Sequence, residues 1–330
     1  MKMFTKLALI SSMAISANAM AMQSMDDAAM SATTGQDGIN IGLGISRLTI
    51  DKVLIHDNDG LAGTAADAGA IVIKAKGGTF NPATNPNALS GIVITANSAA
   101  LLPSHNLADI VIDTAAGAGG GNTAYLNVAA KVSGLNIAIG EIGVSASNAM
   151  PATGATSIRR GAAEATNYNK ILSGLTLKTG VTTANIQLGA APQGAMIKLD
   201  TVMTGGLSID NLGIYDSSTI NTAHYNAAGT IVTSTLAGEI RLDSIKLADA
   251  NGTDLTVQAD ISVVGEAVAG DNTGYLQINT MKTASDAYIK GVHLGSATAG
   301  SIGDIEVQGM NVYNGATGTT PGALIKISGH

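Results

Sequence analysis

The sequence predicts an all-β fold in which short strands turn corners, as in a β-solenoid or β-helix, and loops project from the coils. Three observations carry this prediction. Apolar residues alternate strictly from Ile39 onward, a 2-3-2 spacing of apolar residues recurs along the chain, and aromatic residues make up only 3% of it. Small and branched aliphatic side chains suit the narrow space between closely spaced β-walls.

The N-terminus is typical of a secretory signal peptide. Two lysines precede an apolar stretch from Leu7 to Ile15, and residues 17–19 form an A-x-A cleavage site. A second such site follows at residues 19–21. We therefore expect cleavage after residue 19 or residue 21, followed by export. The apolar stretch is shorter than the roughly 20 residues that span a bilayer, and we expect no transmembrane segment in the mature chain.

The mature chain is acidic. Without residues 1–19 it keeps 15 basic and 24 acidic residues, so its net charge is −9, against −7 for the whole chain. This charge argues against nucleic acid and against an anionic membrane surface as partners. The chain contains no cysteine, so no disulfide framework supports it even though export would permit one.

A polar segment, residues 20–38, separates the signal peptide from the first predicted strand. That strand has an apolar face formed by Ile39, Ile41, Leu43 and Ile45. It can pair within its own domain, or it can add to the open edge of a neighbouring subunit, as donated strands do. We favour pairing within the domain, because the next β pattern follows a bend at Ser46-Arg47 without a linker. The strand is nevertheless the candidate assembly segment.

The 2-3-2 spacing first appears from Leu48 to Ile55. A straight strand with this spacing would turn its second half to the wrong face, so we expect a bend or bulge at Asp51-Lys52. The spacing recurs at Ile137–Val144, Leu207–Ile214, Ile240–Leu247, Ala287–Leu294 and Ile305–Val312. Recurring corners favour a solenoid, whereas the irregular distance between the copies leaves a β-sandwich, or tandem β-sandwiches, with bulged strands as the alternative.

The chain divides into two predicted β-rich halves, residues 39–200 and 201–330, with a possible internal duplication. The segments at 48–57 and 207–216 agree at five of ten positions. The related segments NTAYLNV, at 122–128, and NTGYLQI, at 272–278, lie at a similar offset. Within the first half we expect the loop at 77–87 to project, and residues 157–172 are the best helix candidate.

No residues form a recognisable catalytic constellation. The chain has neither cysteine nor a G-x-S-x-G motif, and its five histidines are scattered singly. The acidic turns DNDG and DANGTD offer calcium candidates, namely Asp57, Asp59, Asp249 and Asp254. Such residues more commonly cap turns. We therefore expect no enzyme activity and no cofactor, with calcium as the one candidate ion.

The stretch MQSMDDAAMSATTGQDGINI, continued by IDKVLIHDNDG, resembles the N-terminus of FilA-type pilus-system proteins of Gram-negative bacteria. The resemblance covers roughly residues 20–60. It implies a component or accessory of a surface filament, without known catalysis, whose partners are other filament proteins or its own copies.

These observations together predict an exported, non-enzymatic structural protein of the cell surface that passes through the periplasm. It would be a pilus or filament component, or an adhesin. The alternative is a secreted carbohydrate-active or ligand-binding β-helix protein, which carboxylates clustered in one groove would favour.

Overall fold

The structure is a computed structural model that describes residues 38–61, 63, 67–117, 123–226, 228–266, 270, 273–296 and 298–328. Residues 40–330 form one compact unit, and of the unit formed by residues 1–39 only Gly38 and Ile39 are described. The predicted signal peptide and nearly all of the polar segment 20–38 therefore lie outside the described residues.

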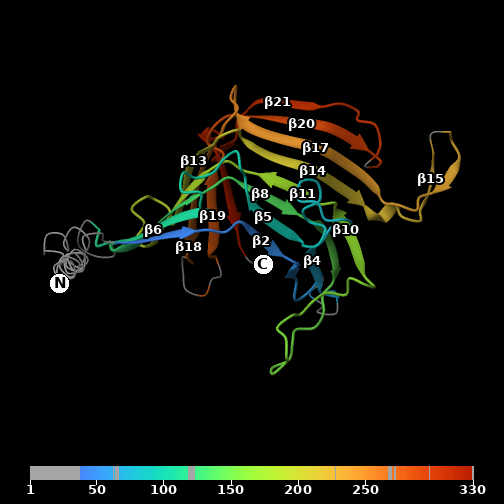
Figure 1. Cartoon of the computed structure of the whole chain (residues 1–330), viewed down its shortest axis with the longest axis horizontal. Coiled ribbons are helices and arrows are strands. Elements are labelled where there is room, and N and C mark those ends of the chain that lie inside the picture. The colour runs from blue at the N-terminus through green and yellow to red at the C-terminus, as the bar shows by residue number, and fades with distance from the viewer. Residues whose placement is uncertain are drawn as a thin grey trace, which may run out of the picture. The chain divides into compact units, whose positions relative to one another are not determined.

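The fold is all-β, as predicted, and its two large sheets are antiparallel (Figure 1). Sheet A consists, in spatial order, of β1 (Ile39–Leu43), β6 (Ala108–Ala115), β7 (Tyr125–Val132), β12 (Thr182–Gly189), β13 (Ile197–Met203), β18 (Leu255–Val264), β19 (Tyr275–Thr280) and β24 (Ala323–Ile327).

Sheet B consists of β2 (Arg47–Ile50), β3 (Val53–His56), β4 (Gly69–Lys74), β5 (Ile92–Ala96), β8 (Leu135–Ile139), β9 (Glu141–Ala146), β10 (Tyr168–Leu172), β11 (Leu175–Lys178), β14 (Leu207–Asp216), β17 (Gly238–Asp249), β20 (Ser285–Leu294) and β21 (Ile305–Met310). Two short hairpins lie outside these sheets: β15 (Ala223–Tyr225) with β16 (Ile231–Thr233), and β22 (Tyr313–Asn314) with β23 (Thr320–Pro321).

The chain crosses from one sheet to the other in eight successive segments, which we call arms. In order along the chain they are β1-β2-β3, β4-β5-β6, β7-β8-β9, β10-β11-β12, β13-β14, β17-β18, β19-β20 and β21-β24. In both sheets the strands follow one another in the order of the arms, and neighbouring arms run in opposite directions. The molecule is therefore a single up-and-down meander that turns a corner between sheet B and sheet A.

The recurring 2-3-2 spacing places aliphatic side chains in rows across sheet B. One row, the Leu48 row, has one residue from each arm: Leu48, Ile94, Ile137, Leu177, Ile209, Ile245, Ile289 and Ile305. A second, the Val53 row, covers the first seven arms: Val53, Ile73, Ile142, Leu172, Ile214, Ile240 and Leu294. A bend lies between the two rows, and it keeps both on one face of the sheet.

The bend predicted at Asp51-Lys52 separates β2 from β3, and backbone hydrogen bonds continue across it to the next arms. The Gly91 N–H donates to the Asp51 carbonyl at 2.9 Å, and the Gly140 N–H donates to the Gly91 carbonyl at 2.7 Å. In the fifth and seventh arms the bend is marked by positive φ at Asn211 (61°) and Gly291 (65°). The eighth arm differs, because its copy of the spacing bulges nearer sheet A, between Val307 and Met310.

The solenoid prediction is wrong. Successive coils of a β-solenoid stack as parallel strands, whereas every strand pair of sheet B is antiparallel, and so is every pair of sheet A from β6 to β24. The 2-3-2 spacing reads the same in both chain directions, so it marks the bend without revealing the direction of the arm. The alternative, a β-sandwich, was expected to contain bulged strands, and the antiparallel strands of sheet B do contain bulges.

Two local predictions also fail. Residues 157–172 contain no helix: β10 occupies Tyr168–Leu172, and turns and irregular backbone precede it. A 3-10 turn, η3, lies further along the chain at Ser217–Thr219. The loop at 77–87 does not project, because the Asn87 side chain donates to the Ala138 carbonyl of β8 at 2.7 Å. This contact holds the loop down on sheet B.

The aliphatic face of sheet B is uncovered in the single chain. None of the side chains in the Leu48 and Val53 rows is buried, and Ile240 and Leu294 are 47% and 50% exposed. Most of the deep burial in sheet B lies on the opposite, polar face, where Val93 and Ala138 are 3% exposed; on the aliphatic face Val292 is buried, with 7% of it exposed. Sheet B thus has a polar face that is partly covered and an apolar face that is largely open.

The bend leaves no room for a side chain at Gly140. A Cβ there would meet the Lys74 carbonyl oxygen, whereas a Cβ at Gly44 would meet nothing within 4 Å. We expect Gly140→Ala to lower the free energy of unfolding by about 1–3 kcal/mol. Gly44→Ala, the matched control, should change it by less than about 0.5 kcal/mol. Urea unfolding of both variants measures this, and equal stability of the two would contradict the close packing at the bend.

Candidate functional site

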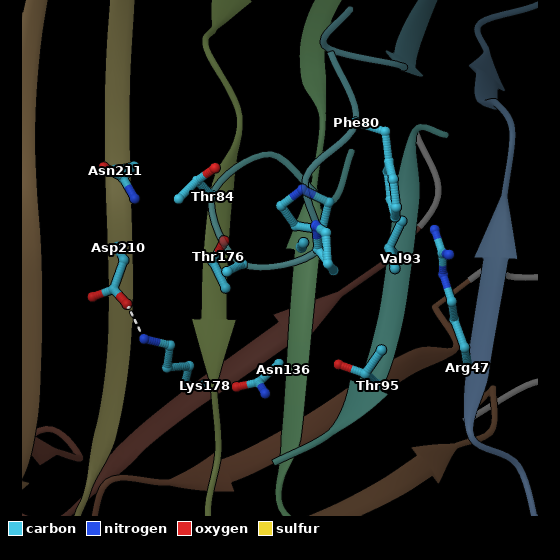
Figure 2. A pocket seen from close by; sticks show the side chains of 14 residues that line it. Arg47, Phe80, Thr84, Val93, Thr95, Asn136, Thr176, Lys178, Asp210 and Asn211 are labelled. Carbon is cyan, nitrogen blue, oxygen red and sulfur yellow. Dashed lines mark ion pairs between the residues drawn. The ribbon is translucent and has the colours of Figure 1, made fainter. Parts of the chain in front are cut away.

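The polar face of sheet B carries a pocket of about 550 Å³ (Figure 2). Part of its floor is a row of side chains from four neighbouring strands: Arg47 of β2, Thr95 of β5, Asn136 of β8 and Lys178 of β11. The next row adds Val93, Ala138, Thr176 and Asp210. Residues alternate between the faces of a strand, so the polar residues between the aliphatic ones of the 2-3-2 spacing come together here.

The wall of the pocket is the loop between β4 and β5. It contributes Phe80, Pro82, Ala83, Thr84 and Pro86. Two asparagines fix this loop: the Asn85 side chain donates to the Gly77 and Thr79 carbonyls at 3.0 and 3.1 Å, and Asn87, which is buried, reaches sheet B. The pocket therefore has an apolar wall and a polar floor, both held by hydrogen bonds.

The charged side chains of the pocket interact with neighbouring side chains, one through a cation–π contact and one through an ion pair. The Arg47 guanidinium lies 5.2 Å from the centre of the Phe80 ring, and Lys178 Nζ is 2.7 Å from Asp210 Oδ2 (Figure 2). Lys178 is half-exposed, so this ion pair contributes little to stability and can exchange for a ligand group. Such an arrangement suits a small polar ligand with one apolar face.

A second charged cluster lies on the same face beyond the bend. Glu141 is 3.6 Å from Lys74 Nζ and 3.0 Å from Lys170 Nζ, and Lys74 Nζ lies 3.4 Å from the centre of the Tyr168 ring. Burial, and then the Glu141 carboxylate, raise the pKa of the Tyr168 hydroxyl. Burial lowers the pKa of Lys76, and neighbouring cations lower it further. Glu141 pairs with both Lys74 and Lys170, so these three charges form a structural network.

The structure brings together a serine and a histidine that the sequence keeps far apart. Ser147 Oγ and His56 Nδ1 are 2.6 Å apart. A histidine that activates a serine must become positively charged, and an acid normally stabilises that charge. Here burial lowers the pKa of His56, and Arg160 lowers it further. The environment of His56 thus opposes the charge that a catalytic base acquires.

Three of the four calcium candidates, Asp57, Asp249 and Asp254, accept hydrogen bonds through their carboxylates within or between turns. Asp57 Oδ1 accepts a bond from the Asp59 N–H, and Asp249 accepts bonds from the N–H and hydroxyl of Thr256 at 2.9 and 2.6 Å. Asp254 accepts a bond from the Gly205 N–H at 2.8 Å. Among the described residues no three His, Cys, Asp or Glu side chains lie together as metal ligands would.

The candidate assembly strand is β1, whose residues Asn40–Leu43 lie beside β6 in sheet A. The Leu107 N–H donates to the Leu43 carbonyl at 2.8 Å, and Ile41 is 38% exposed. Ile39 lies at the start of β1 and is 58% exposed, and Ile45 follows the strand, 39% exposed. Among the described residues, the strand thus pairs on one side only.

One residue in the sequence could have pointed to the pocket, although it belongs to no known motif. Phe80, in the stretch TFNPATNP, is the single phenylalanine after residue 4. The floor could not be found in this way, because Arg47 and Lys178 become neighbours only through the register of the intervening strands.

Comparison with known proteins gives one match. Residues 1–100 match a family of unknown function (DUF6160), which is less than a third of the chain. No curated protein and no solved structure matches the sequence or the fold. Within the described residues, no helix is long and apolar enough to cross a membrane.

Two of the histidines should titrate in opposite directions. The pKa of His293 is raised by its bond to the Ala299 carbonyl and by Asp243, whereas that of His56 is lowered by burial and by Arg160. In an NMR titration we expect His56 to lose its proton at a lower pH than His293. Arg160→Gln should raise the pKa of His56, and Asp243→Asn should lower that of His293. Coincident titration of both rings would contradict this electrostatic description.

Proposed function

We propose that the chain is an exported, non-enzymatic structural protein of the bacterial cell surface, either a component of a filament or pilus system or an adhesin. The observation that carries this proposal is the uncovered aliphatic face of sheet B. Soluble monomers rarely expose continuous apolar patches of this kind, and those that exist usually mark interaction sites. The signal-peptide pattern and the resemblance of residues 20–60 to FilA-type proteins support the location and the class.

The partners are other filament proteins or further copies of the chain. Burial of the open face contributes on the order of 1.5–3 kcal/mol for each large aliphatic side chain, so covering the Leu48 and Val53 rows favours association. If a partner covers the aliphatic face of sheet B, the two layers together form a β-sandwich, which agrees with the alternative fold prediction. The acidic charge of the mature chain disfavours nucleic acid as a partner.

Immunogold labelling of intact cells tests the function. We expect label on surface filaments of cells that produce the protein, and loss of label together with loss or shortening of filaments when the gene is deleted. Label confined to the cell interior, with filaments unchanged by the deletion, would overturn the proposal.

The pocket favours a second candidate function, the binding of a saccharide. Its apolar wall with Phe80 can contact one face of a sugar ring, while Asn136, Thr176 and Asp210 offer hydrogen bonds to hydroxyl groups. This candidate is compatible with an adhesin, whose role is to hold a surface ligand.

A panel of immobilised glycans, followed by titration calorimetry, tests saccharide binding. We expect Phe80→Ala to weaken binding at least tenfold. The matched control is Tyr225→Ala in the β15–β16 hairpin, which removes an exposed aromatic ring outside the pocket and should leave binding unchanged. Absence of binding to every glycan, or equal binding by the Phe80 variant, would exclude this function.

A further inference from the structure

Sheet B is open at both ends. Among the described residues, β2 pairs at one end with β5 alone and β3 with β4 alone; at the other end β21 pairs with β20 alone. Figure 1 shows β21 beyond β20 at one end of this succession and β2 beyond β5 at the other. The backbone groups on the outer side of each edge strand are free to pair with another chain.

The number of arms determines how the two edges fit together. Eight arms alternate in direction, so the first and the eighth run in opposite directions. If a second copy lies with its first arm beside the eighth arm of this one, the antiparallel alternation continues without interruption. Sheet A of one copy then lies beside sheet A of the next copy, and sheet B beside sheet B. The corner between the two sheets therefore continues from copy to copy. A two-fold pairing of identical edges would instead place opposite ends of the arms side by side.

The side chains at the two edges are complementary in this arrangement. The Leu48 row ends in Ile305, so the next copy would continue the row with its own Leu48; these side chains are 48% and 37% exposed. On the polar face, the row through the pocket floor continues as Arg47, Thr95, Asn136, Lys178, Ser208, Lys246, Tyr288 and Glu306. It begins with a cation and ends with an anion.

From these features we propose that copies of this chain join head to tail, the β21 edge of one copy pairing with the β2 edge of the next, so that Glu306 faces Arg47. The proposal rests on the function proposed above and names the partner and the contact. Such an interface uses two different surfaces of each subunit, so it propagates into a filament. The cross-strand pair Ile305–Leu48 and the ion pair Glu306–Arg47 set the register.

The absence of cysteine makes a cross-linking test direct. Within one chain, positions 47 and 306 lie at opposite ends of a row of eight strands, roughly 34 Å apart at about 4.8 Å per strand, too far for a disulfide. The double variant Arg47→Cys with Glu306→Cys should therefore form disulfides only between copies. Under mild oxidation we expect a ladder of multimers on a non-reducing gel that collapses to monomer with reductant.

Three controls define the register. Each single cysteine variant can form at most a dimer. The pair Thr49→Cys with Glu306→Cys shifts one partner by two residues on the same face and should cross-link at least tenfold less. No ladder from the 47–306 pair, or equal cross-linking by the 49–306 pair, would overturn the proposal.

Charge reversal tests the same contact without cross-linking. Arg47→Glu and Glu306→Arg should each slow assembly at least tenfold, measured by light scattering and negative-stain microscopy, and the double reversal should restore it. Both side chains are exposed, so the melting temperature of the monomer serves as the control for folding. Assembly of the wild type that neither reversal affects would refute the edge contact and leave the proposed function standing. Failure of the function itself appears separately, in the immunogold experiment.

Discussion

In sheet B the two aliphatic rows are offset by five positions along the chain, as from Leu48 to Val53 or from Ile289 to Leu294. An odd separation would put the rows on opposite faces of a straight strand. The bend absorbs the extra residue, and neighbouring arms bend side by side, so hydrogen bonds pass from Asp51 to Gly91 to Gly140. Without it, half of each arm would turn its aliphatic side chains into the polar face, and the pocket and the charged cluster could not form.

The sequence revealed this bend but not the architecture around it. The spacing from Leu48 to Ile55 identifies the position of the bend correctly, because alternation is a property of a single strand. It carries no information on which strand lies alongside, and a symmetrical spacing fits parallel and antiparallel neighbours equally. The pocket floor needs the same missing information, since Arg47 and Lys178 meet only through pairings among four strands. In 157–172 the pairing of β10 with β9 and β14 overrides the helical pattern.

The two faces of sheet B explain how one layer can be both a stable fold and an interaction surface. The loop between β4 and β5 and the paired charges around Glu141 cover parts of the polar face, where most of the deep burial in sheet B lies. If the aliphatic face associates as proposed, stability depends on subunit concentration, because whatever covers the face stabilises the folded chain by mass action. In the proposed assembly, folding and association are coupled, and the unassembled chain is the less stable state.

The even number of arms limits how such a chain can lengthen during evolution. Insertion of one arm would leave the last strand running in the same direction as the first, and the two edges could no longer meet as antiparallel neighbours. Insertion of two arms, or of four, preserves the relation. The matching segments at 48–57 and 207–216 belong to the first and fifth arms, and those around β7 and β19 belong to the third and seventh. Each pair is four arms apart, the interval that duplication of a four-arm ancestral gene segment would produce.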